Sequence, residues 1–240
     1  MRLLLSVITL ALIITSVPCL AQPAAGEGGN TPPGTPIRAK SEKFTLECPV
    51  GWQSRQYEKL EESMTAKLIM QGGLMKMLGE DPKVTDNLNL WWSPQGEASW
   101  FMTGIASVHR IETKDDVDMK KVWIDFNGGK LPDGIKAQPA QLGDYVGILG
   151  GGLLQQPPLY IAAALISQGK STYVATIMGQ QQAIAPQWPN FMKLLCSLKA
   201  SDLKAQKLED FLKQDTAPEE EGDEDEGGDK TDDAADAKEQ

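Results

Sequence analysis

The chain has 240 residues, of which 41% are hydrophobic and 23% charged, and its formal net charge is −10. This length is enough for one domain with a sizeable core and flanking segments. The acidic charge is concentrated in residues 215–240, which contain 13 acidic and 2 basic side chains. Because the remainder is close to neutral, the sequence excludes a broad basic surface for nucleic acid or for an anionic membrane.

The first residues, 1–21, have the pattern of a signal peptide. Arg2 supplies the positive start, residues 3–14 form an apolar run, and the small residue Ala21 precedes the expected cleavage site. The run is shorter than the roughly 18 to 20 apolar residues of a spanning helix, which favours cleavage over retention as an anchor. We therefore expect an exported protein, periplasmic or extracellular, that touches a membrane only if the signal is not removed.

The segments that flank the central domain differ from it in composition. Residues 22–40 are rich in Pro, Gly, Ala and Thr and lack apolar periodicity, which predicts a flexible linker. Residues 201–214 are expected to form a further helix. Residues 215–240 are too acidic and too poor in apolar side chains to fold, so they predict a disordered tail. One ordered domain is expected between these segments, at residues 41–200.

The domain opens with a strand in which Phe44 and Leu46 alternate with polar residues. Pro49 ends this strand because it has no amide donor for a sheet. Gly51 then allows a turn that brings Trp52 back over the apolar face of the strand.

A short strand at 53–57 precedes a helical pattern that continues to Leu78. Gly72 and Gly73 interrupt the pattern and predict a kink or a division into two helices. Four methionines could give this region an adaptable docking surface for a partner, although a buried stripe is the commoner meaning of such a pattern. The candidate docking residues are Met64, Met70, Met75 and Met77, and the apolar stripe is Tyr57, Leu60, Met64, Leu68, Met75 and Leu78.

The next part of the domain is mostly strand. A helix is expected at 115–126, where Asp115, Asp116 and Asp118 are placed to cap its start and not to bind a cation. The three glycines at 150–152 are not followed by a Lys-Ser/Thr pair, so they predict a turn between strands and not a phosphate loop. Strands are expected at 88–92, 98–111, 135–142, 145–149, 159–167 and 172–178, with a hairpin turn at 168–170.

A closing helix follows Pro186 and Pro189, which suit the first turn of a helix. Its apolar stripe consists of Trp188, Phe191, Leu195 and Leu198. Together these elements predict an α+β fold, a mostly antiparallel β-sheet flanked by helices.

Two stretches carry a resemblance to a known superfamily. They are FTL at 44–46 leading into PVGW at 49–52, and FMKLLCSLK at 191–199. The first is similar to the opening strand and turn, and the second to the closing helix, of the PsbP-like α/β/α sandwich proteins. That superfamily includes the PsbP subunit of photosystem II and a nuclear Ran-binding release factor. The resemblance implies a non-catalytic accessory or binding role, and it transfers no functional residue because both signatures are structural.

Removal of the signal would leave two cysteines, Cys48 and Cys196. In an oxidising compartment two cysteines usually pair. We expect a disulfide that joins the first strand to the closing helix; the alternative is two separate buried thiols.

The sequence offers little for catalysis or metal binding. His109 is the single histidine and no Gly-x-Ser-x-Gly motif is present, so neither a His-pair zinc site nor a Ser-His-Asp triad is expected. We interpret His109 as a surface histidine on a strand, and we expect no cofactor and no metal. Trp91 and Trp92 point to opposite sides of their strand; an exposed one could stack on a sugar or peptide, and burial under a helix is the simpler interpretation.

These observations predict an exported, non-catalytic accessory or binding protein whose partner is an unknown envelope protein. One alternative is an envelope hydrolase with a carboxylate site that the spacing does not identify; a cleft with paired buried carboxylates would favour it. Another alternative is weak binding of divalent cations by residues 215–240.

Overall fold

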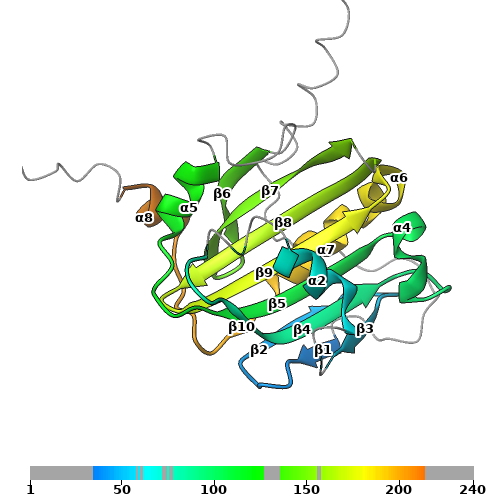
Figure 1. The fold of residues 1–240 in the computed structure, drawn as a ribbon, viewed down its shortest axis with the longest axis horizontal. Coiled ribbons are helices and arrows are strands. Elements are labelled where there is room, and N and C mark those ends of the chain that lie inside the picture. Colours follow the sequence, from blue (N-terminus) through cyan, green and yellow to red (C-terminus); the bar gives the residue numbers. More distant parts are fainter. Residues whose placement is uncertain are drawn as a thin grey trace, which may run out of the picture.

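Two antiparallel sheets dominate the computed structural model (Figure 1), which describes residues 35–57, 59, 62–71, 75, 78–126, 136–155 and 158–213. The strands are β1 Thr35–Arg38, β2 Phe44–Cys48, β3 Gln53–Gln56, β4 Lys83–Trp91, β5 Ile105–Glu112, β6 Lys136–Leu142, β7 Tyr145–Gln155, β8 Pro158–Gln168, β9 Ser171–Gly179 and β10 Lys199–Ala200. The helices are α2 Met64–Gln71, α4 Trp100–Thr103, α5 Met119–Asp125, α6 Gln181–Ile184, α7 Trp188–Cys196 and α8 Leu208–Lys213, with short 3-10 turns η2 Glu97–Ser99 and η4 Ala185–Gln187.

The larger sheet has the order β3-β4-β5-β9-β8-β7-β6, and every neighbouring pair in it is antiparallel. The smaller sheet has the order β1-β2-β10, so the first strand of the domain pairs with the residues that follow the closing helix. The fold is therefore α+β with a mostly antiparallel sheet, as the sequence predicts.

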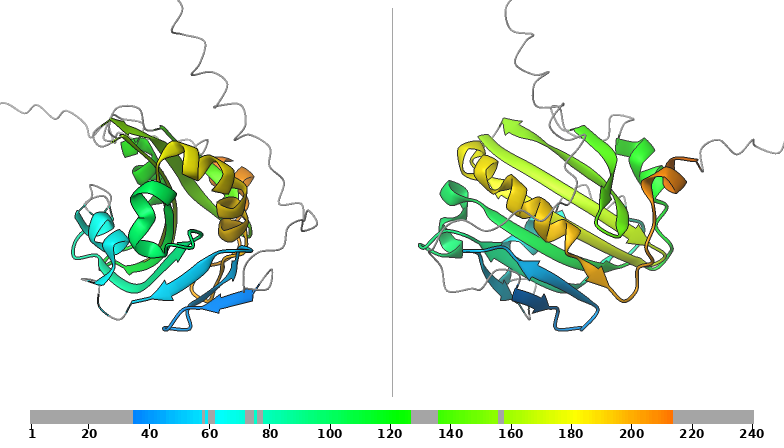
Figure 2. Two further views of the ribbon diagram at one scale, coloured as in Figure 1. Left: turned by 90° about the vertical axis from the view of Figure 1, so that its right-hand side faces the viewer. Right: turned by 180° about the vertical axis from the view of Figure 1, so that it is seen from behind.

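Helices cover both faces of the large sheet. The α2 helix lies in front of the sheet in Figure 1, and α7 crosses the opposite face when the molecule is seen from behind in Figure 2. We refer to these as the α2 face and the α7 face.

The α7 face carries the largest apolar core, because β2 and α7 both pack on it. Phe44 and Leu46 are 2% exposed, as their alternation in the strand predicts, and Phe191 of α7 is fully buried. The Trp52 ring packs on the Trp92 ring with centroids 4.8 Å apart. The opening strand, its turn and the closing helix thus form one hydrophobic unit.

The α2 face carries two separate apolar clusters. One gathers Ile69 of α2 and Met119 of α5 with strand residues that include Ile111 and Val174. The other lies toward α4 and contains Ile105 and Met178, together with Leu159 and the partly buried Trp100. A polar region of the sheet lies between them.

Several predicted elements need correction. Residues 150–152 continue β7, because they pair with β8 in register, and do not form a turn. The predicted strand at 98–111 begins only at Ile105, after η2 and α4. The predicted helix at 201–214 is confined to α8 among the described residues, and the predicted linker at 22–40 contains β1. The signal at 1–21 and the tail at 215–240 lie outside the described residues and stay predictions.

The predicted disulfide between Cys48 and Cys196 is wrong. Cys48 is a free thiol, 3% exposed, that points into the core with Phe44 and Leu46. Its Sγ donates to the backbone oxygen of Trp52 at 3.5 Å, and burial raises the pKa of the thiol. Strand alternation places Cys48 on the buried side of β2, where its thiol packs as a small apolar side chain.

Candidate functional site

Five buried polar side chains gather on the α2 face, where the first turn of α2 meets β4 and β5. Asn87 is 4% exposed, and the other four are completely buried. None of them is charged, and three come from neighbouring positions of two paired strands. We call this group the polar patch; its members are Ser63, Thr65, Asn87, Asn89 and His109.

Strand geometry and helix capping assemble the polar patch. Residues two apart in a strand share a face, so Asn87 and Asn89 point to the same side. Asn87 lies opposite His109 in the register of β4 and β5. Ser63 caps α2 by accepting the backbone N–H of Ala66 at 3.2 Å, which fixes the first turn of the helix above the strands.

The donor and acceptor roles in the polar patch can be assigned one after another, starting from Glu97. The Asn89 side-chain N–H donates to Glu97 Oε1, because an ionised carboxylate only accepts. The Asn89 Oδ1 therefore faces Thr65, whose hydroxyl donates to it at 2.5 Å. Thr65 Oγ1 is then an acceptor for His109 Nε2, 3.2 Å away. This order places the imidazole proton on Nε2 and leaves Nδ1 as an acceptor.

His109 is completely buried, which corrects its interpretation as a surface residue. Burial lowers the pKa of His109 to about 3, because the charged imidazolium would be desolvated. A general base works best with a pKa near the working pH. His109 is therefore suited to accept a hydrogen bond and poorly suited to remove a proton.

Glu97 links the polar patch to Tyr57. The Tyr57 hydroxyl donates to Glu97 Oε2, and Arg55 lies over the Tyr57 ring with its Cζ 4.8 Å from the centroid. Burial and the bond to Glu97 raise the pKa of Tyr57 to about 12. The carboxylate thus has a donor on each oxygen, one from Tyr57 and one from Asn89.

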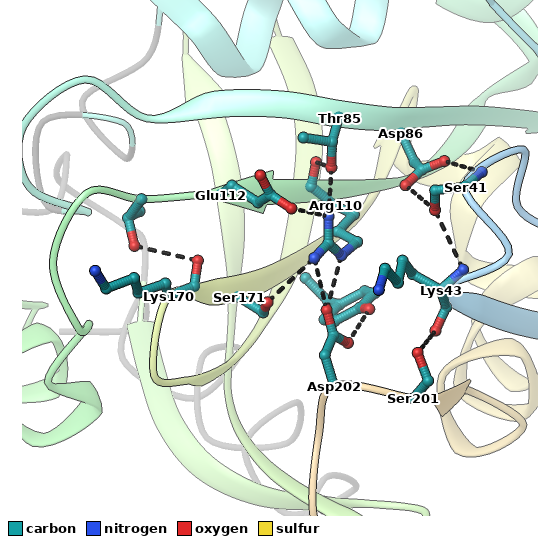
Figure 3. A network of polar contacts seen from close by, with 12 residues as sticks. Ser41, Lys43, Thr85, Asp86, Arg110, Glu112, Lys170, Ser171, Ser201 and Asp202 are labelled. Carbon is teal, nitrogen blue, oxygen red and sulfur yellow. Dashed lines mark hydrogen bonds and ion pairs between the residues drawn. The ribbon is translucent and has the colours of Figure 1, made fainter.

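The opposite face of the same strands holds a second polar group, drawn in Figure 3, whose side chains converge on Arg110. Arg110 Nε and Nη2 donate to Asp202 Oδ2 at 2.9 and 2.7 Å. Its other N–H groups donate to Glu112 Oε1 at 2.7 Å, Thr85 Oγ1 at 2.8 Å and Ser171 Oγ at 3.3 Å. All five guanidinium donors are used.

Asp202 completes this group by accepting the Tyr173 hydroxyl at 2.5 Å. Burial alone would raise the pKa of Asp202, but hydrogen bonds from Tyr173 and Arg110 outweigh it and the pKa is lowered. Ser41 binds Asp86 nearby, and the Ser201 N–H donates to the Lys43 oxygen at 2.8 Å. These contacts tie the small sheet and the chain after α7 to the large sheet, which is a structural role.

The expected buried stripe of the methionine region is present only in part, since Met75 and Leu78 are buried and Leu68 is exposed. Among the described side chains of α2, Thr65, Ala66 and Ile69 are buried, whereas Leu68 is 42% exposed. Met75 is 5% exposed in the core of the α2 face, so it is not an exposed docking residue, and Met64 is half-buried. The side chains of Met70 and Met77 lie outside the described residues.

The remaining predicted residues have local roles. Asp118 caps α5 by accepting the backbone N–H groups of Lys120 and Lys121, as predicted. Trp92 packs on the core of the α7 face, and Trp91 is half-buried with its ring N–H on Gln53 Oε1. Within the described residues no three His, Cys, Asp or Glu side chains gather as metal ligands.

Sequence reasoning missed Asn87 and Asn89, although the signal was present. The stretch DNLNLW alternates Asn with Leu, which predicts a strand with one apolar and one solvated face. The structure covers the asparagine side with α2.

Comparisons with known proteins place the chain in no family. No family model matches the sequence, and no curated protein matches it. A solved structure from Bacteroides thetaiotaomicron VPI-5482 is similar with a TM-score of 0.42 and 12% identity, over 76% of this chain and 57% of that one. This similarity assigns neither a fold family nor a function. No described helix is long and apolar enough to span a membrane.

Proposed function

We propose that this chain is an exported binding protein that works without chemical turnover, and that its ligand-contacting groups belong to the polar patch. The single observation that carries the proposal is the environment of His109: the ring is completely buried, its Nε2 bonds Thr65, and its Nδ1 has no partner among the described residues. A side chain in that state recognises a donor and does not shuttle protons.

The carboxylates near the two polar groups support binding over hydrolysis. Glu97 has donors on both oxygens, from Tyr57 and Asn89. Asp202 is held ionised by Arg110 and Tyr173, so it is unsuited to act as a general acid near neutral pH. A glycosidase-type or aspartyl-type site needs carboxyl groups with separated pKa values and room for a substrate.

We also propose that the domain is a PsbP-like sandwich with an accessory role in the cell envelope. The support is the opening strand with its Pro-x-Gly-Trp turn, the helices on both faces of the sheet, and the closing helix α7. The signal pattern at 1–21 supports export.

Retention of a small molecule from an envelope extract tests the proposed function. The full-length exported protein is incubated with the extract, passed through gel filtration and denatured, and the released molecules are identified by mass spectrometry. We expect one compound to be retained and released unchanged. A matched control is Thr172→Val, which alters a buried hydroxyl of the same sheet face outside the polar patch.

Conversion of an extract component into a product, abolished by Glu97→Gln, would contradict the proposal and favour the enzyme alternative. A protein that neither retains nor converts any component would also contradict it.

A further inference from the structure

Three buried side-chain atoms on the α2 face have no hydrogen-bond partner within the described part of the chain. They are Nδ2 and Oδ1 of Asn87 and Nδ1 of His109. Asn87 is 4% exposed and His109 is completely buried. Buried polar atoms are almost always paired, so three unpaired atoms on adjacent residues need a physical reason.

The two residues that carry these atoms are neighbours on paired strands. Asn87 and His109 are directly opposite in the register of β4 and β5 and share a face of the sheet. Together they present one donor group and two acceptors: the Asn87 N–H₂, the Asn87 oxygen and the bare His109 Nδ1. The order of bonds from Glu97 through Asn89 and Thr65 sets the acceptor character of Nδ1.

A band of small side chains runs across the sheet beside these atoms. Register places Ser107 next to Thr176, Thr176 next to Ala163, and Ala163 next to Gly150, on strands β5, β9, β8 and β7. Ser107 is fully buried, whereas Ala163 and Gly150 are half-buried. The band separates the two apolar clusters of the α2 face and becomes more exposed toward β7.

From these observations, and resting on the proposed function, we propose that Asn87 and His109 bind a neutral primary carboxamide, or a planar group with the same edge. A carboxamide oxygen accepts the Asn87 N–H, and one carboxamide N–H donates to Asn87 Oδ1, as in a paired amide dimer. The second carboxamide N–H donates to His109 Nδ1. Each of the three unpaired atoms then has one partner.

The charge of the site favours a neutral ligand. Burying an ion without a counter-ion is strongly unfavourable, and Glu97, the carboxylate of this network, already has donors on both oxygens. An ester or a tertiary amide lacks the N–H groups that both acceptors need. The band of small side chains along β5, β9 and β8 lies beside these atoms, and we expect the rest of the ligand to lie along it.

Nitrogen NMR of the imidazole tests this proposal directly, because His109 is the single histidine of the chain. The probe is acetamide, with N,N-dimethylacetamide as the analogue without N–H groups and acetate as the charged analogue. We expect a saturable shift of His109 Nδ1 with acetamide. Loss of the paired hydrogen bonds should make the response to N,N-dimethylacetamide about tenfold weaker or more.

Two variants separate recognition from general effects on the fold. Asn87→Leu has a similar volume and removes two of the three atoms, so its response to acetamide should fall about tenfold. Thr172→Val leaves all three atoms in place and should respond like the natural protein. A blocked glutamine peptide carries the same amide: a stronger response to the peptide assigns the source to a protein partner, and a stronger response to acetamide assigns it to a small molecule.

Equal responses to acetamide and N,N-dimethylacetamide, a stronger response to acetate, or no response to any probe would overturn the proposal. So would an acetamide response that survives Asn87→Leu. Retention of an extract compound by Asn87→Leu would leave the proposed function intact while this inference fails. If the protein instead bound an amide and converted it into a product, the carboxamide inference would hold and the proposed function without turnover would fail.

Discussion

The two faces of the large sheet bury polar side chains in different ways. On the α7 face Arg110 uses all five of its donors, and Asp202 accepts from Arg110 and Tyr173. On the α2 face Asn87 and one nitrogen of His109 are unpaired among the described residues. Complete hydrogen bonding suits a structural role, whereas a buried neutral group with unpaired atoms is costly unless a further partner supplies the missing bonds. Variants that remove one group at a time can break or sharpen this comparison.

The largest effect is expected on the α7 face, from Asp202→Ala. This change leaves the Arg110 guanidinium, 5% exposed, without its main counter-ion and should lower the free energy of unfolding by roughly 3 kcal/mol. Urea denaturation measures the loss. Glu112→Ala removes the other carboxylate of the same guanidinium, but Glu112 is 51% exposed, so that control should cost about 1 kcal/mol or less. Equal losses in the two variants would show that the buried Arg110–Asp202 pair does not stabilise the domain more than an exposed ion pair does.

The second prediction concerns the pH dependence of stability, which differs between His109 on the α2 face and Asp202 on the α7 face. The pKa of His109 is about 3 in the folded chain and 6.5 in the unfolded chain, so below pH 6.5 the unfolded state binds more protons and stability falls. Between pH 7 and pH 5 this contribution is about 2 kcal/mol. Asp202 behaves differently, since its folded pKa is lowered and its stabilisation is lost only below the ordinary value of 3.8.

Urea denaturation of the natural protein and of His109→Gln at pH 7 and pH 5 checks the histidine contribution. The natural protein should lose about 2 kcal/mol more than the variant, because glutamine does not titrate. Identical losses would mean that His109 is accessible to protons in the folded state.

The third prediction is a gain in stability, whereas the first two are losses. Asn87→Leu replaces a buried amide without partners by an apolar side chain of similar size, so it should raise the free energy of unfolding by about 1 kcal/mol. Asn89→Leu is the matched variant, and it should be destabilising because Asn89 bonds Glu97 and Thr65. Calorimetric melting of both variants gives the comparison, and destabilisation by Asn87→Leu would show that Asn87 is satisfied in solution.

The smallest effect is expected outside both faces. Residues 215–240 contain no Leu, Ile, Val or aromatic side chain. Deleting them should change the free energy of unfolding by less than about 0.5 kcal/mol. A melting temperature lower by more than a few degrees would show that the tail contributes to the folded domain.

The elements that the sequence predicts well are those with a local cause. The alternation of Phe44 and Leu46 predicts β2, and the stripe through Phe191 predicts α7. The turn residues at 168–170 predict the hairpin between β8 and β9, and Gly169 adopts φ +59° there. Each of these patterns is complete within a few residues of chain.

The candidate site was not predictable in this way, because its burial depends on contacts between distant segments. Asn87 and Asn89 lie on a polar strand face that becomes interior only when the first turn of α2 covers it. His109 is predicted as a surface residue and is buried for the same reason, because the first turn of α2 covers its face of the sheet. The face of α2 that packs on the sheet also differs from the face that its apolar residues predict, since Thr65 is buried and Leu68 is exposed. Tertiary contacts override local preference at these positions.

The most direct test is the imidazole nitrogen spectrum of His109 as a function of pH. The structure predicts a neutral ring with its proton on Nε2 and an unprotonated Nδ1, unchanged from pH 7 to pH 5. A ring that titrates near its ordinary pKa of 6.5, or a ring with its proton on Nδ1, would contradict the hydrogen-bond order of the polar patch and the binding role proposed for it.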